Sequence, residues 1–439
     1  MAAIGPPDIS TPLTDRDDVF LRPDETAGLN IAGGLGNDRI RTGTGNDRLF
    51  GGEGTDTLIG DVGDDILTGG PGRDLLSGGL GADIASYMDS PAPVRVTLAA
   101  GRGFGGDAEG DQLVGIDGLF GSAFADRLVG DDRDNVLVGM GGGDTLIGGG
   151  GDDNLGEIEG MDAPNTLFGG AGDDELFLES AGSEAYGGAG NDIVASIIGD
   201  GGHTLFGGAG NDTVAGDNFG DDTVFGGAGD DLMGAGPGND TVFGGAGNDQ
   251  IFFQGGPGTS TVYGGAGDDF IADPDASGAD GAQAFGNAGN DTFEFEVSGD
   301  DETSGFELFG GTGDDLFILN GTTDSTLIGG AGDDVFDIWG GGNVVAGNAG
   351  ADTFRLDLGT VTIRDFSDED VIDLTATAPN GSPVTFADLT ITSVAGGNAT
   401  LITAEGPDPC GSDDDFTILS IRLNRVDAST VTEDDFLFA

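Results

Sequence analysis

The chain has 439 residues, of which 91 are glycine and 80 are acidic, and its 14 basic residues are all arginine, so the formal net charge is −66. This charge argues against nucleic acid and anionic membrane as partners, because both present phosphate groups that repel it. A single cysteine excludes an internal disulfide framework, and no apolar run is long enough to span a membrane.

Residues 1–32 form an N-terminal lead-in, which ends in the first half-coil of a repeat at Asn30 and Ile31. The first residues lack the basic and apolar regions of a secretory signal. If the protein is exported, we therefore expect it to leave the cell without an N-terminal signal.

Residues 33–86 consist of one nine-residue unit repeated six times without a gap. The first four positions are rich in glycine, which favours a tight turn with accessible backbone carbonyl groups. The sixth position is always aspartate: Asp38, Asp47, Asp56, Asp65, Asp74 and Asp83. The eighth position is apolar: Ile40, Leu49, Leu58, Leu67, Leu76 and Ala85. A turn followed by an inward side chain predicts that each unit is one half-coil of a solenoid.

Stacking of the coils would bring the aspartates of one edge together. Successive turns lie about 4.8 Å apart, so carboxylate and carbonyl oxygens of neighbouring coils surround a common point. Ca²⁺ takes roughly six to eight oxygen ligands in a flexible cage. No His or Cys occurs in these repeats at ligand spacing, which argues against zinc. The alternative, that the aspartates only cap turns, would allow Asp and Asn indifferently.

The nonapeptide GGxGxDxUx resembles the repeats of the RTX (repeats-in-toxin) family. The resemblance implies an all-β fold, a parallel β-roll (β-solenoid), in which aspartate carboxylates and backbone carbonyls of two adjacent turns bind each calcium ion. It also implies a protein of a Gram-negative bacterium that is exported by type I secretion machinery and is extracellular or lies at the cell surface.

The repeat is interrupted at residues 87–120, a non-repeat β insertion expected to pack against the roll, and it resumes as a second block at residues 121–164. The expected metal ligands of this block are Asp126, Asp144 and Asp153. Asn135 replaces the aspartate of one unit, which should weaken a site there.

Residues 165–364 form a long β-roll with one regular and one irregular edge. Two nonapeptides make one full coil, and the strong turns recur once per coil, with insertions between some of them. The regular edge carries Asp174, Asp192, Asp212, Asp231, Asp249, Asp269, Asp291, Asp315, Asp334 and Asp352. The irregular edge absorbs the insertions but keeps two candidate ligands, Asp222 and Asp240. Such insertions either mark a binding surface or are tolerated drift.

An aromatic column precedes the strong turns, at position nine: Phe168, Tyr186, Phe206, Phe225, Phe243, Tyr263, Phe285 and Phe309. Because position eight points inward, strand alternation places position nine on the outer face. The rings either stack on one another and stiffen the roll, or they form a docking stripe.

The resemblance implies that residues 365–439 are a C-terminal cap and type I secretion signal. The segment RDFSDEDVIDLT resembles the end of the β-roll in secreted RTX proteins, and EDDFLFA resembles a type I secretion signal. Cys410 lies here, as either an inert thiol or the site of an intermolecular disulfide.

The sequence contains few residues of the types that usually act in catalysis. His203 is the only histidine, which excludes an HExxH zinc site, and we expect it to be a solvated residue of a relaxed turn. Paired carboxylates could serve a glycosidase, but the repeat already accounts for them. We therefore expect no enzyme activity.

The sequence predicts a secreted, calcium-folded structural protein that self-assembles as a surface layer, matrix or filament. Roughly sixteen Ca²⁺ sites would neutralise about 32 of the negative charges. The partners would be further copies of the chain, the type I secretion machinery and cell-surface or matrix glycan. The alternatives are an extracellular polysaccharide-modifying or lytic RTX enzyme and a glycan-binding adhesin.

Overall fold

The computed structural model describes residues 11–23, 26–157, 163–197, 201–216, 219–253, 259–273, 281–296, 305–321, 324–357, 359–375, 384–394, 399–407 and 415–438. Cys410 and most of the two longest turns of the irregular edge, at residues 274–280 and 297–304, lie outside the described residues. The chain divides into two compact units, Met1–Thr213 and Val214–Ala439. No described helix has the length and hydropathy needed to cross a bilayer.

Each nonapeptide forms one turn and one short strand, as the sequence predicts. The second and fourth turn positions need a positive φ, which glycine adopts at little cost; Gly34 and Gly36 have φ of 110° and 115°. The position-eight side chain then points into the roll, and Ile40, Leu49 and Leu58 are fully buried. Strands two nonapeptides apart pair in register, so that Ile31 lies beside Leu49.

In unit 1, two parallel sheets face each other across this buried column. Sheet 1 contains, in order, β1 (Thr11–Pro12), β3 (Asn30–Leu35), β5 (Arg48–Glu53), β7 (Ile66–Thr68), β9 (Ile84–Ser86), β13 (Gly118–Phe120), β15 (Val136–Val138), β17 (Asn154–Gly156), β19 (Glu175–Leu178) and β21 (Ile193–Ser196). Sheet 2 contains β2 (Val19–Leu21), β4 (Arg39–Arg41), β6 (Thr57–Val62), β8 (Leu75–Leu80), β12 (Gln112–Val114), β11 (Arg102–Phe104), β10 (Arg95–Thr97), β14 (Arg127–Val129), β16 (Thr145–Gly150), β18 (Thr166–Ala171), β20 (Glu184–Ala189) and β22 (Thr204–Ala209).

The segment 87–120 is built into the roll. Strand β12 pairs parallel with β8, and β13 pairs parallel with β9, so both continue the solenoid. Strand β11 is antiparallel to β10 and β12, and the short 3-10 helix η1 (Gly106–Ala108) joins β11 to β12. The lead-in also contributes, because β1 and β2 pair parallel with β3 and β4.

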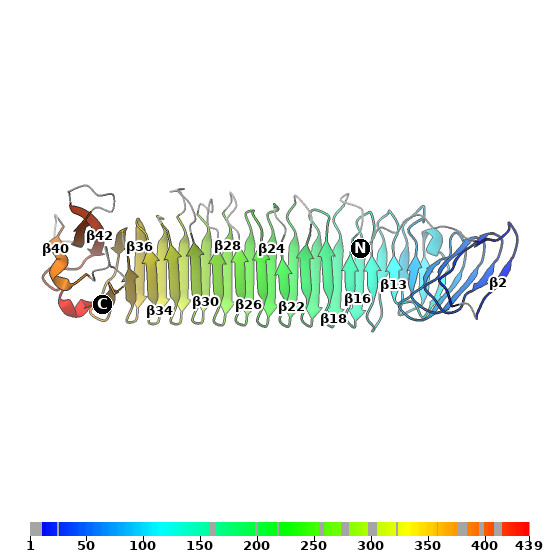
Figure 1. The fold of residues 1–439 in the computed structure, drawn as a ribbon, viewed down its shortest axis with the longest axis horizontal. Coiled ribbons are helices and arrows are strands. Elements are labelled where there is room, and N and C mark those ends of the chain that lie inside the picture. Colours follow the sequence, from blue (N-terminus) through cyan, green and yellow to red (C-terminus); the bar gives the residue numbers. More distant parts are fainter. Residues whose placement is uncertain are drawn as a thin grey trace. The chain divides into compact units, whose positions relative to one another are not determined.

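Unit 2 repeats the two-sheet design, and β23 (Thr213–Ala215) falls at the unit boundary. Sheet 1 contains β25 (Leu232–Ala235), β27 (Gln250–Phe253), β29 (Phe270–Asp273), β31 (Thr292–Glu296), β33 (Leu316–Asn320), β35 (Val335–Trp339), β37 (Thr353–Leu356), β39 (Val371–Asp373) and β43 (Phe436–Leu437). Sheet 2 contains β24 (Thr223–Ala228), β26 (Thr241–Ala246), β28 (Thr261–Ala266), β30 (Gln283–Ala288), β32 (Glu307–Thr312), β34 (Thr326–Ala331), β36 (Asn343–Ala349) and β38 (Gly359–Ile363). Figure 1 shows these strands side by side, with turns at both ends.

A C-terminal cap closes sheet 2 of unit 2. Strands β40 (Leu389–Ser393), β41 (Ala399–Pro407) and β42 (Asp415–Asn424) form an antiparallel meander, and β42 pairs parallel with β38. The short 3-10 helices η3 (Phe386–Asp388) and η4 (Glu433–Asp435) flank it. The structure therefore confirms the predicted fold class, an all-β parallel β-roll with a small β cap.

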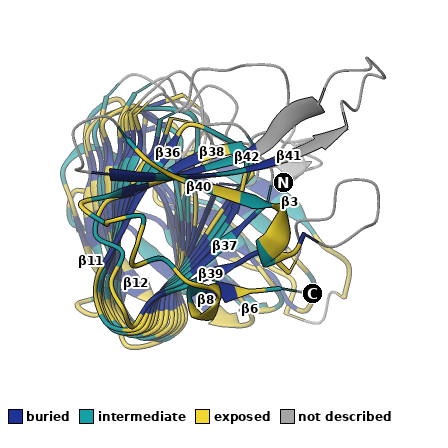
Figure 2. Ribbon diagram, turned by 90° about the vertical axis from the view of Figure 1, so that its left-hand side faces the viewer, coloured by how far each residue is buried: buried dark blue, intermediate teal, exposed yellow. Residues whose placement is uncertain are grey.

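Burial alternates along every coil, with dark blue strand segments inside and mostly yellow turns at the edge in Figure 2. In unit 2, the interior of sheet 1 contains a stack of four fully buried rings, Phe293, Phe317, Phe336 and Phe354, with centroids 4.7 to 5.2 Å apart. This inner stack was not predicted, although all four residues occupy position eight of the repeat.

The rings of the outer aromatic column also stack on one another within each unit. In unit 1 the centroid distances are 4.9 Å for Phe168 and Tyr186 and 4.6 Å for Tyr186 and Phe206. In unit 2 the rings of Phe225, Phe243, Tyr263, Phe285 and Phe309 follow at 4.7 to 5.0 Å, within 12° of parallel. These rings are partly exposed, whereas their position-eight neighbours are buried.

Candidate metal centres

All 21 aspartates predicted as metal ligands lie at turn position six, immediately before a strand, and none is more than 4% exposed. The turn and the register of the coils hold them in columns along the edges of each unit. Burial of so many carboxylates requires compensating partners, because an ionised group loses its hydration there. Their hydrogen bonds show where part of that compensation comes from.

One carboxylate oxygen of each typical aspartate is bonded to the backbone of the preceding coil. The Asp38 N–H donates to Oδ1 of Asp56 at 2.7 Å, and the Asp56 N–H donates to Oδ1 of Asp74 at 2.7 Å. In unit 2, the Asp291 N–H donates to Oδ1 of Asp315 at 2.8 Å. This ladder orients every carboxylate in the same way and commits one of its two oxygens.

The second oxygen, Oδ2, is buried without a hydrogen-bond partner among the described residues in fifteen of these aspartates. They are Asp38, Asp47, Asp56, Asp65, Asp74, Asp83, Asp144, Asp153, Asp174, Asp192, Asp249, Asp269, Asp291, Asp315 and Asp334. A Cβ on Gly310 would overlap Oδ2 of Asp315 and lie 2.7 Å from the Gly329 carbonyl oxygen. The leftover carboxylate oxygen and a carbonyl oxygen of the next coil therefore face one small space that only glycine leaves open.

The electrostatics of the columns favour a bound cation. Burial, and after it the negative charge of neighbouring aspartates, raises the pKa of Asp65, Asp315 and Asp334 to about 7. Backbone N–H donors oppose the rise but do not cancel it. A divalent cation at Oδ2 would remove both the desolvation cost and the mutual repulsion.

The donor set fits calcium. Each space offers carboxylate and carbonyl oxygens, and no described group of three His, Cys, Asp or Glu side chains is placed to hold a metal by side chains alone. The ligands would thus be one carboxylate per coil with backbone carbonyls, an all-oxygen set of the kind Ca²⁺ takes. Bound Ca²⁺ would supply charge neutralisation and a cross-link between coils.

The neighbouring turn position separates metal binding from turn capping. At position five, a second ladder runs in the opposite sense: the Asn191 N–H donates to Oδ1 of Asp173 at 2.7 Å, and the Asp314 N–H donates to Oδ1 of Asn290 at 2.7 Å. Asp and Asn alternate freely there, because only an acceptor is needed. Position six on the regular edge is aspartate throughout, so a capping role alone does not account for it.

On the irregular edge, neutral side chains take over the acceptor role. Ser183 Oγ accepts the Asn165 N–H at 2.9 Å, Ser260 Oγ accepts the Asp240 N–H at 3.2 Å, and Asn343 Oδ1 accepts the Ser325 N–H at 3.1 Å. The hydrogen-bond ladder therefore continues where the negative charge is absent. Sequence reasoning missed these residues, although they fall at the aspartate position of the period.

His203 occupies this same position and is only 2% exposed. The expectation that it is solvated is wrong. The turn places its side chain inward, as it does for the aspartates, so the period rather than the polarity of imidazole decides its location.

Several residues depart from the simple pattern. Both carboxylate oxygens of Asp126 are engaged, since Oδ1 accepts the Val94 N–H at 2.7 Å and Oδ2 accepts the Ser122 N–H. Outside the predicted set, Asp111 and Asp370 accept the N–H groups of Asp74 and Asp352 and so extend two columns.

Glu157 is a further candidate ligand that the sequence analysis missed. It is 5% exposed, its Oε2 accepts a hydrogen bond from Ser180 Oγ at 2.7 Å, and its Oε1 is buried without a partner among the described residues. Burial raises the pKa of Asp144, and the charges of Asp126 and Glu157 add to that rise. Glu157 stands at a turn position that is usually glycine, which is the only signal the sequence offers.

Comparison with known proteins agrees with this geometry. A family model described as the RTX calcium-binding nonapeptide repeat (4 copies) matches residues 30–58, 50–85, 120–155, 157–180, 197–233, 218–251 and 252–272. No curated protein matches the chain in sequence.

Two solved structures are similar to parts of the chain. The AlgE6R3 subunit of the Azotobacter vinelandii mannuronan C5-epimerase has 21% identity and a TM-score of 0.18, and the match covers 40% of this chain and 79% of that chain. The extracellular lipase LipA from Serratia marcescens has 17% identity and a TM-score of 0.15, and the match covers 56% of this chain and 40% of the lipase.

Proposed function

This chain is an RTX β-roll protein with calcium-binding nonapeptide repeats, and from that premise we propose that it is a secreted structural protein that folds on binding calcium and then self-assembles outside the cell. The assembled form would be a surface layer, matrix or filament. The observation that carries the proposal is the column of buried carboxylates whose Oδ2 atoms face backbone carbonyls instead of hydrogen-bond donors.

Calcium-coupled folding follows from the charge of the chain. With a net charge of −66 the metal-free chain repels itself, and the buried columns add a desolvation cost on top of that repulsion. Each bound Ca²⁺ removes two charges, so roughly sixteen ions would offset about half of the total. Because the unfolded chain holds no preformed site, the free energy of binding stabilises the fold.

Export of an unfolded chain is consistent with folding that depends on calcium. Sites of the extracellular type bind Ca²⁺ with a Kd on the order of 10⁻⁴ to 10⁻³ M, well above the free calcium of a cytosol. The chain would therefore remain unfolded until it emerges through a type I secretion system. Residues 433–439 would serve as the signal.

The outer face of sheet 2 in unit 2 supports the proposal of self-assembly. Strands β24, β26 and β28 present only threonine and aromatic side chains there, namely Thr223, Phe225, Thr241, Phe243, Thr261 and Tyr263. In so acidic a chain, an uncharged stripe is a surface through which two copies can meet without direct repulsion. The proposal includes no catalytic role.

The test is to purify the unfolded chain and add calcium. Millimolar Ca²⁺ should produce a β-rich circular dichroism spectrum, and light scattering and electron microscopy should then show ordered assemblies. Excess chelator should reverse both changes. A spectrum that does not respond to chelator would overturn calcium-coupled folding, and a folded chain that stays monomeric at high concentration would overturn self-assembly.

A further inference from the structure

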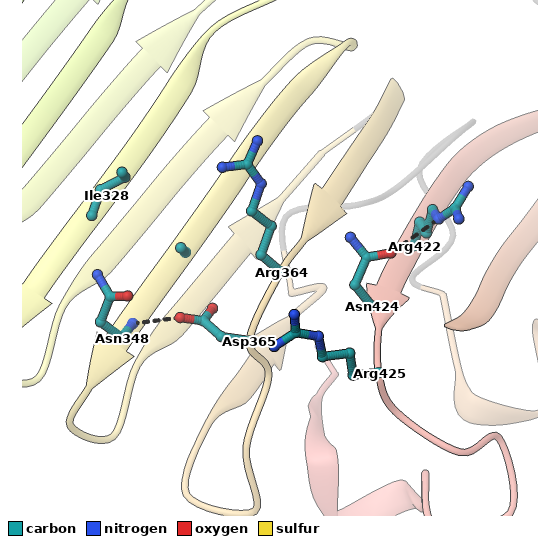
Figure 3. A pocket seen from close by; sticks show the side chains of 8 residues that line it. Ile328, Asn348, Arg364, Asp365, Arg422, Asn424 and Arg425 are labelled. Carbon is teal, nitrogen blue, oxygen red and sulfur yellow. Dashed lines mark hydrogen bonds between the residues drawn. The ribbon is translucent and has the colours of Figure 1, made fainter. Parts of the chain in front are cut away.

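A pocket in Val214–Ala439 lies where the outer face of sheet 2 passes from the last regular coils into the cap. Its volume is about 720 Å³, and its polar lining comprises Asn348, Arg364, Asp365, Arg422, Asn424 and Arg425. Figure 3 shows Arg364, Asp365 and Arg425 between the strand that carries Ile328 and the strand that carries Asn424. None of these residues belongs to the aspartate columns.

The pocket forms where the side chains of the outer column become small. Strand register places Phe309 beside Ile328 and Ile328 beside Ala346, so the column shrinks from an aromatic ring to a methyl group. The next residue in the column is Arg364, whose N–H donates to the Val345 carbonyl oxygen at 2.9 Å. The missing ring volume at Ala346 leaves room beside the arginine.

Among the described residues, no carboxylate forms an ion pair with the three arginines of the pocket. Unit 2 has four arginines and no lysine, and Arg355 is paired with Asp337 at 2.9 Å and with Asp373 at 3.1 Å. Arg364, Arg422 and Arg425 form no ion pair with any described residue.

Asp365 is the one acid among the residues that line the pocket, and it accepts two backbone hydrogen bonds. Asp365 accepts the Gly347 N–H at 3.2 Å through Oδ1 and the Asn348 N–H at 2.9 Å through Oδ2. Arg422 donates to Asn424 Oδ1 at 3.1 Å. Arg425 also has a φ of 67°, a conformation that residues with a Cβ rarely adopt and that recurs at ligand-binding positions. Clustered guanidinium groups in one hollow point to an anionic ligand.

We propose that this pocket binds an acidic saccharide. A carboxylate or sulfate group of the sugar would pair with Arg364 and Arg425. The sugar hydroxyl groups would bond to Asn348 and Asn424, whose carboxamides both donate and accept. Ile328 and Ala346 supply a small apolar wall for the ring carbons. The volume lies within the usual range of ligand pockets, roughly 300 to 1,000 Å³.

Other ligand classes fit less well. A lipid chain or other apolar ligand would find only Ile328 and Ala346 to pack against. The acidic edges would repel a saccharide at long range, but salt screens charges beyond about 8 Å at physiological ionic strength, and calcium bound along the columns would lower the repulsion. The arginines act within that distance.

The experiment measures binding to the full chain folded in calcium, by calorimetry at constant ionic strength. The probes are tetragalacturonate as the carboxylated sugar, a sulfated tetrasaccharide of heparin type, neutral maltotetraose, and sodium sulfate. The variant is Arg364→Gln with Arg425→Gln, which removes two charges. The matched control is Arg39→Gln with Arg22→Gln, which removes the same number of charges from exposed arginines outside the pocket.

At least one acidic tetrasaccharide should bind, and the pocket variant should weaken it at least tenfold, whereas the control variant should bind as the parent does. The carboxylated and sulfated arms show which oxyanion is preferred. Equal binding of maltotetraose, equal binding by the pocket variant, or binding of sulfate alone would each overturn the proposal. The inference needs the calcium-folded chain of the proposed function but not its self-assembly. Circular dichroism of each variant in calcium separates loss of the pocket from loss of the fold.

Discussion

At the scale of single residues, the buried aspartates couple folding to protons as well as to calcium. When no cation is bound, Asp65, Asp144 and Asp153 favour the protonated form, because burial and neighbouring carboxylates disfavour the charge. Burial raises the pKa of Asp65, Asp144 and Asp153 to about 7, from a value of 3.8. Protons and Ca²⁺ therefore compete for the same oxygens.

Without calcium, the roll should become less stable as the pH rises. Since the folded-state pKa exceeds the unfolded value, each group contributes stability that is complete below about pH 3.8 and is lost as the pH rises through about 7. In chelator, circular dichroism should therefore show more β structure at pH 4.5 than at pH 8, where the metal-free chain is unfolded. In calcium the order should reverse, because deprotonated carboxylates bind the ion more tightly. A metal-free chain that gains β structure as the pH rises would contradict these raised pKa values.

Substitution of one aspartate tests its role as a ligand. Asp315→Asn retains an acceptor for the Asp291 N–H but removes the charge at Oδ2, so the turn should form while its calcium sites weaken. Asp314→Asn is the matched control, because position five already alternates between Asp and Asn. Calcium titration should show fewer bound ions and a higher folding midpoint for Asp315→Asn only. Equal midpoints for both variants would reduce Asp315 to a turn cap.

Met140 carries local backbone strain. It stands at turn position two with a φ of 71°, where glycine is normal. Met140→Gly should therefore stabilise the roll by about 1 kcal/mol, the typical cost of a left-handed residue with a Cβ. A thermal melt in calcium would measure the gain. Gly34→Met, at the same turn position, should have the opposite sign.

At the scale of elements, unit 2 contains two aromatic stacks with different exposure. The inner rings fill the space between the sheets, whereas the outer rings stand on sheet 2 and are partly exposed. Both stacks repeat at the strand spacing, because parallel register places identical positions side by side. The two stacks therefore differ in their burial and not in the geometry of ring stacking.

The two stacks should respond differently to substitution. Phe317→Ala opens a cavity in the core and should destabilise the fold by about 3 to 5 kcal/mol. Replacing Phe243, Tyr263 and Phe285 by Ser removes rings from the surface, so calcium-dependent folding should remain while assembly fails. Thermal melts and light scattering on the same samples give both readouts. Full assembly by the triple variant would leave the outer stack with a structural role only.

At the scale of the whole molecule, the proposed function places folding after export. A secretion signal must then work on an unfolded chain, independently of the roll. A reporter fused to residues 365–439 should be exported by a type I system, whereas the same reporter fused to residues 365–432 should remain in the cell. The reporter avoids a confounding effect, because truncating the full chain would also remove β43, which pairs with β39. Export of the shorter fusion would refute the C-terminal signal.

The sequence by itself determined the features that repeat. These features are the period, the aspartate columns, the buried position eight and the outward aromatic column. They repeat because each coil places its residues beside the equivalent residues of the next coil. Strand alternation and parallel register convert such a period directly into geometry. The fold class and the position of every predicted ligand at a buried turn could therefore be stated in advance.

The tertiary structure decided what the period does not encode. Which carboxylate oxygen is committed to an N–H and which faces a carbonyl depends on the contact between coils. The replacement of Asp by Ser183 or Asn343, the burial of His203, and the role of Glu157 depend on the same contact. The arginine pocket depends on the pairing of β42 with β38, two segments far apart in the chain. The meander that joins them is not part of the repeat. No local spacing signals that pairing, so only the folded cap brings Arg364 and Arg425 together.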